Sequence, residues 1–320
     1  MISQSDLYPE AQGRNAWIIR HRPDLSAFRR KLSVDRPAAW IEEEEPDADG
    51  NLERFLTVFL TNRECPWRCL MCDLWRQTTL ETVSPGAIPR QIEFALRSVS
   101  GAPGVKLYNA GSFFDPGAIP AEDLPRIAEL LSSRNRLVVE CHPSLVGPKV
   151  TRFAESLGTV QLEVALGLET AHPMTLERLN KGMTLDDFSR AVAFLRNAGI
   201  DVRAFVLVKP PFLDETESLY WAEESARFAF DAGATVVSLI PTRLGNGALD
   251  ALAELGQFSE PGLDLLEGAM DRALGLGRGR VFCDLWDLER FGKSSPGFLE
   301  RRARLDSMNR TQRVLPRIPC

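Results

Sequence analysis

Six short apolar runs recur along the middle of the chain, and segments with helical spacing separate them. The runs are FLTVFL (55–60), VKLYNA (105–110), LVVECHP (137–143), VQLEVALG (160–167), VRAFVLV (202–208) and TVVSLIP (235–241). Apolar runs of this length, without strict polar alternation, are typical of parallel strands that are buried on both faces. The pattern therefore predicts six buried strands.

The segments between these runs carry apolar residues three or four positions apart, which is the spacing of an amphipathic helix. They are residues 89–99, 121–133, 148–157, 184–199 and 215–233. In the fourth segment, Thr184 and Asp187 are close to a capping box. Because strands and helices alternate six times, the sequence predicts right-handed βαβ units and an α/β fold. Eight units would close a barrel, so six predict a partial (β/α)6 barrel.

The two ends of the chain break this rhythm, and we predict a separate segment at each. Residues 1–52 show weak periodicity and are interpreted as an N-terminal extension, whereas residues 53–245 make up the barrel core. Residues 246–320 contain a helical pattern, a short strand (RVFCDLW) and a final helical pattern. We interpret them as a small C-terminal α/β subdomain that closes one side of the barrel.

The charge of the chain limits its partners without excluding a local basic surface. The 320 residues carry a net charge of −6, which disfavours nonspecific binding of a polyphosphate over the whole surface. Two basic patches, residues 20–36 and 301–317, are either solvated surface charge or contact surfaces for an anionic partner. An acidic run, Glu42–Glu45, follows the first patch.

The distribution of apolar residues favours a cytoplasmic protein that does not engage a membrane. No apolar run approaches the roughly 20 residues that a membrane helix needs. The N-terminal MISQSDLYPEAQGR lacks the apolar core of a secretory signal. Disulfides are rare in the cytoplasm, so cysteines there are more often ligands or inert core residues.

Three of the six cysteines, Cys65, Cys69 and Cys72, have a C-x3-C-x2-C spacing directly after the first predicted strand. Parallel barrels hold their chemistry at this end of the strands. A closed zinc site needs a fourth ligand, and His21 and His142 are remote in sequence. Three cysteines can hold three irons of a cubane and leave the fourth open, so the spacing favours a 4Fe–4S cluster. A zinc site and buried thiols are the alternatives.

This motif, placed after the first strand of a six-unit βα chain, resembles the radical S-adenosylmethionine (SAM) superfamily. The resemblance implies a radical SAM enzyme in which SAM chelates the open iron and the reduced cluster breaks the sulfonium C–S bond. A 5′-deoxyadenosyl radical then abstracts a substrate hydrogen. The resemblance also implies a low-potential electron donor such as flavodoxin or ferredoxin.

The same resemblance implies roles for residues near the cofactor. Met71 takes the place of an aromatic residue that packs near the adenine. Ala110, Gly111 and Ser112 fall where a small motif contacts the methionine amino group, and a glycine there would let the backbone approach a ligand closely. The usual acidic residue of that motif is absent, and the alternative is a simple strand-to-loop turn.

Two further segments, LEVALGLET and RLNKGMTLDDF, resemble the branch that contains the Elongator catalytic subunit and the methylthiotransferases. Glu169 then falls where a polar side chain binds the ribose hydroxyls. Lys181 stands in the place of the arginine that pairs with the methionine carboxylate; it keeps the charge but loses the bidentate fork. The alternative for Lys181 is a solvent-facing lysine before a helix cap.

Together with KLYNAGSFFDPGAIP and VLVKPPFLDE, these segments resemble the radical partner of archaeosine synthase and its bacterial relatives. This resemblance covers about residues 55–245 and identifies a subfamily without transferring a substrate. Together with the Arg-rich tail it supports the hypothesis of a radical enzyme that acts on a nucleoside or tRNA. Two alternatives stay open. One is a radical SAM enzyme that acts on a small metabolite or peptide, and the other is a non-catalytic protein that binds the cluster and SAM.

Residues at other strand ends are candidates for contact with the substrate. Cys141 and Cys283 could face the barrel mouth, where a thiol can donate a hydrogen atom, although cysteine is more often an inert core residue. With Cys320 they could also hold a second cluster. Lys209 and Arg243 are candidates for anchoring an anionic substrate group.

Overall fold

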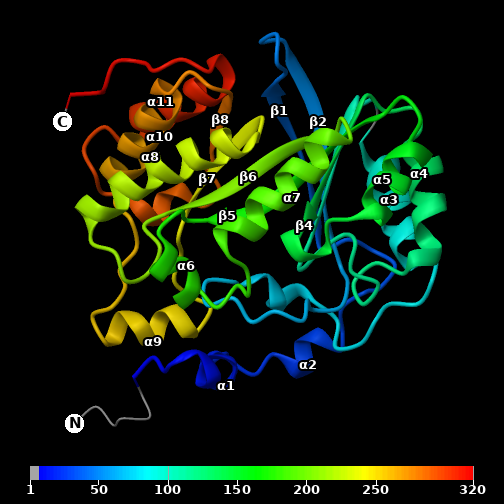
Figure 1. Cartoon of the computed structure of the whole chain (residues 1–320), viewed down its shortest axis with the longest axis horizontal. Coiled ribbons are helices and arrows are strands. Elements are labelled where there is room, and N and C mark those ends of the chain that lie inside the picture. Colours follow the sequence, from blue (N-terminus) through cyan, green and yellow to red (C-terminus); the bar gives the residue numbers. More distant parts are fainter. Residues whose placement is uncertain (1–6, 100, 320) are drawn as a thin grey trace.

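The computed structural model describes residues 7–99 and 101–319, and its strands form one curled sheet (Figure 1). The strands are β1 (Ala39–Pro46), β2 (Leu52–Leu60), β3 (Gly104–Asn109), β4 (Arg136–Cys141), β5 (Gln161–Glu169), β6 (Asp201–Val208), β7 (Val236–Pro241) and β8 (Arg280–Cys283). They lie in chain order, with β2 to β8 parallel and β1 antiparallel to β2. The six predicted strands are present as β2 to β7, which confirms the predicted α/β partial barrel.

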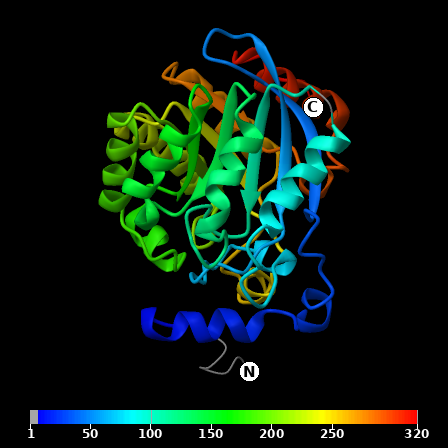
Figure 2. The same cartoon turned by 90° about the vertical axis from the view of Figure 1, so that its right-hand side faces the viewer.

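Most helices cover the outer side of the curled sheet (Figures 1 and 2). Their bounds are α1 (Ala11–His21), α2 (Ser26–Arg29), α3 (Ala87–Ser98), α4 (Leu124–Leu131), α5 (Pro148–Ser156), α6 (Pro173–Arg178), α7 (Leu185–Asn197), α8 (Glu215–Ala232), α9 (Ala248–Glu254), α10 (Leu263–Gly275) and α11 (Phe298–Thr311). Thr184 and Asp187 form the predicted capping box at the start of α7. In the part of the chain that the structure describes, no helix has the length and apolar character that a membrane crossing needs.

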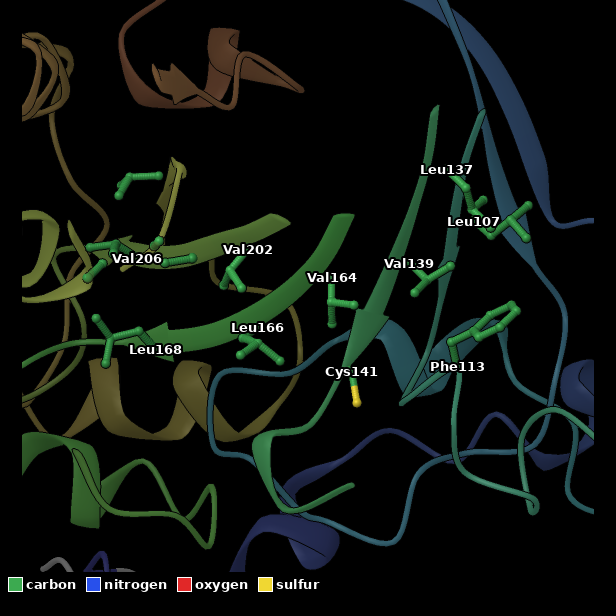
Figure 3. Close-up of a cluster of buried hydrophobic side chains, with 14 of the residues drawn as sticks. Leu107, Phe113, Leu137, Val139, Cys141, Val164, Leu166, Leu168, Val202 and Val206 are labelled. Carbon is green, nitrogen blue, oxygen red and sulfur yellow. The ribbon is translucent and has the colours of Figure 1, made fainter. Parts of the chain in front are cut away.

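The layer between the sheet and the helices is the main hydrophobic core. Alternate side chains of neighbouring strands enter it, among them Leu107, Val139 and Leu166, together with Phe113 from the loop after β3 (Figure 3). This burial explains the apolar runs of the sequence. Cys141 belongs to the same layer and is 4% exposed, so its thiol lies on the helix-facing side of β4.

The concave face of the sheet carries paired charges near the starts of the parallel strands. Arg203 donates hydrogen bonds to Glu45 of β1 and to Glu163 of β5, both at 2.6 Å. Lys106 pairs with Glu45 at 2.5 Å. Although burial acts in the opposite direction, Arg203 and Lys106 hold the pKa of Glu45 below its ordinary value. Pairing of this kind is what allows charged side chains to be buried.

Two strands differ from the sequence-based expectation. β1 lies within residues 1–52, where the pattern predicts no strand, because its inward positions include Glu43 and Glu45 rather than apolar residues. β8 pairs parallel with β7 and so extends the main sheet. The sheet therefore runs through all three predicted segments, and the division at residues 52 and 245 stays a prediction.

The N-terminal segment crosses the end of the sheet at which the parallel strands stop. α1 and α2 lie along this end in both views (Figures 1 and 2). Trp17 of α1 packs with Leu70 of the cysteine loop and with Leu249 of α9. Arg14, which is buried, pairs with Glu177 at 2.6 Å. The segment predicted as an extension is thus packed over the barrel mouth.

The Arg-rich segment near the C-terminus is not a free basic surface. Arg301 and Arg304 of α11 are only 2% and 4% exposed. They pair with Glu267 of α10 at 2.6 and 3.3 Å respectively, and Asp264 and Asp271 add further partners. Both interpretations, as solvated charge and as a contact for an anion, are therefore wrong for these two arginines, because carboxylates of the same chain already neutralise them.

Candidate active site

The cysteine loop follows β2 and is held by loops that follow two other strands. The Leu70 N–H donates to the Leu179 carbonyl at 2.9 Å. The side chain of Asn180 donates to the Arg68 carbonyl, and that of Asn246 donates to the Leu70 carbonyl, both at 2.8 Å. The loops after β5 and β7 therefore fix the backbone that carries the three cysteines.

A single carboxylate ties this loop to the N-terminal segment. Glu64 accepts from Arg22 at 2.6 Å and from Arg29 at 3.2 Å, and it lies 3.4 Å from Arg68. Arg68 in turn donates to the Cys65 carbonyl at 2.6 Å. Arg22 and Arg29, which belong to the first basic patch, are therefore neither solvated charge nor a free anion contact. They position the residue next to the first cysteine.

The three thiols are protonated at neutral pH until a metal displaces the protons. Burial raises the pKa of all three, that of Cys69 to about 11, while the positive charge of Lys181 acts in the opposite direction on Cys65 and Cys69. Thiolate ligands must lose their protons when they bind iron. The cation beside Cys65 and Cys69 favours that loss.

The three thiols and the loop after β3 form a donor set that fits an iron–sulfur cluster. A cubane binds each thiolate through a different iron. Gly111 has a φ of 151°, and a Cβ there would lie 2.8 Å from the Cys65 Cβ. Only glycine lets the loop after β3 approach Cys65 this closely. The donor set and this close approach therefore fit a 4Fe–4S group.

The other residues of the predicted cofactor motif are placed less directly. Ala110 is half-buried beside Gly111. Ser112 is fully buried, and its hydroxyl accepts from the His142 N–H at 3.2 Å, so it faces β4. Met71 packs against the cluster of apolar residues under α1. Contacts of Ala110, Ser112 and Met71 with SAM stay predictions.

Glu169 and Lys181 lie together on the concave side of the strand ends. The Lys181 Nζ donates to Glu169 Oε1 at 2.6 Å, and both side chains are buried. A Cβ on Gly167 would lie 2.1 Å from that oxygen and 2.4 Å from the nitrogen, so the pair occupies the space that the glycine leaves. Although burial opposes it, the charge of Glu169 raises the pKa of Lys181. The alternative of a solvent-facing lysine is therefore wrong.

A stacked pair of rings connects the cysteine loop to the Lys181 loop. Trp67 and His142 have ring centroids 3.8 Å apart and planes that differ by 8°. The His142 Nε2 lies 3.0 Å from the Lys181 carbonyl, so this nitrogen carries the ring proton. Burial and then the charge of Lys181 lower the pKa of His142 to about 4. The stack therefore joins the two loops without adding a charge at neutral pH.

The remaining strand-end candidates are buried or already engaged. Cys141 and Cys283 are 4% and 3% exposed and lie in the main core, which favours the inert interpretation, while Cys320 lies outside the described residues. Lys209 bonds to the Ser259 hydroxyl at 2.8 Å. Arg243 bonds to a carboxylate of the loop after β8 at 2.7 Å. The predicted roles of these residues in catalysis, a second cluster or substrate anchoring stay predictions, and their placement does not support them.

One ionisable residue of the concave face was missed by the sequence interpretation. Glu140 precedes Cys141 at the end of β4 and points to the opposite side, because successive side chains of a strand alternate. Its Oε2 accepts from the Asn109 N–H at 3.0 Å. Burial raises the pKa of Glu140 to about 8. The alternation of side chains within LVVECHP is the signal that places Glu140 on the face opposite Cys141.

A parallel half-barrel with a three-cysteine loop at its strand ends defines a class of cluster-dependent enzymes. Residues 59–220, just over half of the chain, match the family model described as the Radical SAM superfamily, and the chain belongs to that superfamily. Members bind a 4Fe–4S cluster and SAM, so the predictions of the family, of an enzyme and of these two cofactors are confirmed.

Individual relatives carry more specific names. The archaeosine synthase subunit beta of Thermococcus kodakarensis is 32% identical over 165 residues, which cover 49% of this chain and 51% of that protein. Its namesake in Methanosarcina acetivorans is 29% identical over 229 residues, covering 67% and 65%. The chain thus spans between about half and two thirds of its curated relatives. A solved queuine lyase from Clostridium spiroforme, bound to SAM and queuine, matches with a TM-score of 0.47 and 18% identity over 63% of this chain and 80% of that one.

Proposed function

We propose that this chain binds a 4Fe–4S cluster through Cys65, Cys69 and Cys72, cleaves SAM reductively and directs the radical to a nucleoside or tRNA. The observation that supports the site best is the approach of Gly111 to Cys65, with the cation of Lys181 close enough to act on that thiol. When bound, the cluster supplies the electron for the cleavage. Flavodoxin or ferredoxin is the expected electron donor, and a reducing compartment such as the cytoplasm keeps the thiols available.

The residues of the chain divide the binding of SAM among them. An ammonium group has three N–H donors, so Lys181 is able to hold Glu169 and the carboxylate of SAM at the same time. Glu169 is a hydrogen-bond acceptor for the ribose hydroxyls. The backbone at Gly111, which lies close to Cys65, would contact the amino group of SAM. α1 and α2 cover this end of the barrel and help to exclude water from it.

The choice of a nucleoside or tRNA is supported by the relatives named archaeosine synthase subunit beta. The tail arginines do not support it, because Arg301 and Arg304 are neutralised inside the chain. A small metabolite or peptide is therefore the alternative substrate.

The experiment uses anaerobically reconstituted full-length protein reduced with dithionite. We expect about four irons per chain and slow formation of 5′-deoxyadenosine, measured by mass spectrometry. Addition of total tRNA should accelerate this formation. The Cys65→Ala variant is the control for cluster dependence. A sample with a full complement of iron that forms no 5′-deoxyadenosine would contradict the cleavage. A sample that cleaves SAM but binds no tRNA in a filter assay at any salt concentration would favour the alternative substrate.

A further inference from the structure

The side chains of Phe59, Tyr108 and Glu140 form a row across three neighbouring strands on the concave face of the sheet. Phe59 of β2 pairs in register with Tyr108 of β3. The ladder between β3 and β4 ends one residue before Tyr108 and Glu140, which places these two side by side. The rings of Phe59 and Tyr108 are 6.2 Å apart, and the ring of Phe205 lies 6.1 Å from Tyr108. The row lies at the mouth that carries the candidate active site.

This row is partly open to solvent, whereas its neighbours in sequence are closed. Phe59, Tyr108 and Glu140 are each half-buried, but the residues on either side of them in the three strands are buried. Apart from Asn109, the residues on either side belong to the packed core between the sheet and the helices. The exposed area of these three side chains therefore lies on the concave side of the sheet.

Glu140 is the carboxyl of this row, and it makes no salt bridge with the residues that the structure describes. Its carboxylate accepts from the Asn109 N–H at 3.0 Å and feels longer-range fields from Lys181 and Glu169. Lys181 is committed to Glu169 at 2.6 Å, and the phenol of Tyr108 is held neutral because burial raises its pKa well above the ordinary range. Burial likewise raises the pKa of Glu140 to about 8. A half-buried carboxyl of this kind gains from a cationic partner.

We propose that Glu140 binds a cationic group of the substrate, an ammonium or an amidinium, beside the ring of Tyr108. The face of an aromatic ring carries the negative end of its quadrupole, so the Tyr108 ring attracts the same cation. The inference rests on the proposed function in one respect: the bound group is taken to be part of the molecule on which the radical acts. It assigns that molecule a positive charge near its reacting end.

A purely structural role for Glu140 is the competing explanation. The carboxylate would then serve only to hold the Asn109 N–H and keep the ends of β3 and β4 together. Glu140→Gln separates the two explanations, because the amide oxygen accepts the same hydrogen bond while the negative charge is lost. The visible absorption of the reconstituted cluster reports whether the variant is folded. Glu155→Gln, an exposed carboxylate on α5, is the matched control.

The experiment measures the binding of two small probes to the reconstituted full chain with SAM present. Benzamidinium carries the cation and an aromatic ring, and benzamide is its neutral isostere. We expect benzamidinium to bind at least about tenfold more tightly than benzamide, and Glu140→Gln to weaken only benzamidinium, by about ten- to a hundredfold. Glu155→Gln should bind both probes like the wild type. Ligand-observed nuclear magnetic resonance or calorimetry gives the affinities.

The pH dependence adds a second readout that a structural role would not produce. Benzamidinium stays protonated near neutral pH, whereas the free Glu140 carboxyl releases its proton at about 8. Below that pH, binding must displace a proton, so the affinity should fall by about tenfold for each unit of pH. Lys181 and Glu169 face the same region, but they are already paired with each other. Glu140→Gln should therefore remove the dependence of benzamidinium affinity on pH.

Two results would overturn the inference. They are equal affinities for benzamidinium and benzamide, or benzamidinium binding by a folded Glu140→Gln variant that matches the wild type. These results are independent of SAM cleavage. If 5′-deoxyadenosine forms but Glu140 does not discriminate the probes, only this inference fails. If the probes are discriminated but no 5′-deoxyadenosine forms, the proposed function fails instead.

Discussion

The carboxylate of Glu169 and the ammonium of Lys181 lie 2.6 Å apart, in the space that a side chain at Gly167 would occupy. A register shift in β5 between Gly167 and Glu169 and a φ of 68° at Glu169 turn the carboxylate into this position. A non-glycine residue in the left-handed region costs about 1–3 kcal/mol and persists only where its surroundings over-determine it. Asn180 is also left-handed, with a φ of 56°. Backbone strain thus gathers beside the cysteine loop.

Replacing Gly167 by alanine tests whether this pair holds SAM. The new Cβ would collide with both Glu169 and Lys181, so one of the two must move. Because charged hydrogen bonds are worth about 1.5–3 kcal/mol, SAM should bind about ten- to a hundredfold more weakly. Calorimetry on the reconstituted protein measures this. Gly275→Ala, at an exposed helix position with nothing within 4 Å, is the control; equal affinities in both variants would remove the pair from the SAM site.

The cysteines separate into two groups with different expected behaviour. Replacing Cys65, Cys69 or Cys72 by alanine should abolish the broad visible absorption of the cluster while the barrel stays folded, because each thiolate binds its own iron. Cys141→Ala should keep the absorption, since its thiol lies in the core between the sheet and the helices. Iron and acid-labile sulfide contents check both statements. Loss of the cluster in the Cys141 variant, with circular dichroism unchanged, would show that this thiol is a ligand.

The order of strands and helices could be predicted because each buried strand leaves an apolar run and each helix leaves a 3.6-residue period. The three cysteines could be predicted because their spacing is local. Glu169 and Lys181 could be assigned to the mouth only through a resemblance, since 12 positions separate them in the sequence. Their contact depends on a bulge in β5 that leaves no compositional signal.

The sequence does not predict the burial of charged residues whose partners are distant along the chain. Arg304 looks like a surface residue in a basic tail, yet its partner Glu267 lies 37 positions away. Arg22 finds Glu64 across 42 positions, and Glu45 finds Arg203 across 158. Charge alone indicates solvent exposure. Only the tertiary structure shows that each of these charges has a partner of opposite sign.

The corrected role of the tail arginines predicts a stability effect where a binding effect was expected. Arg304→Gln leaves Glu267 and Asp271 with fewer counter-charges, and breaking a buried pair of this kind costs about 3–5 kcal/mol. Arg302→Gln is the matched control, because its side chain is 47% exposed and its only described salt bridge is 3.4 Å long; a change within about 0.5 kcal/mol is expected. Urea denaturation measures both. Similar effects of the two substitutions would contradict the burial of Arg304.

The network around Glu45 predicts how stability depends on acid. Its pKa is depressed in the folded chain, chiefly by Arg203 and Lys106 acting against burial. The unfolded chain therefore takes up a proton at a higher pH than the folded chain. The stabilisation is complete above the ordinary glutamate value of about 4.3 and is lost as the pH falls below it. The free energy of unfolding, measured in urea between neutral and acid pH, should show this loss.

Glu45→Gln and Glu44→Gln form a matched pair on adjacent positions of β1. Glu45 is 6% exposed and faces the buried network, whereas Glu44 points outward to Arg310 at 2.8 Å. The first substitution removes one of the carboxylates that pair with the buried Arg203 and Lys106. It should cost about 3–5 kcal/mol at neutral pH and flatten the acid limb. The second should change the stability by less than about 1 kcal/mol and leave the acid limb as in the wild type. Only a group whose proton affinity differs between the folded and unfolded states makes the free energy of unfolding depend on pH. If this free energy falls with acid equally steeply in the wild type and in Glu45→Gln, another carboxylate controls the acid transition.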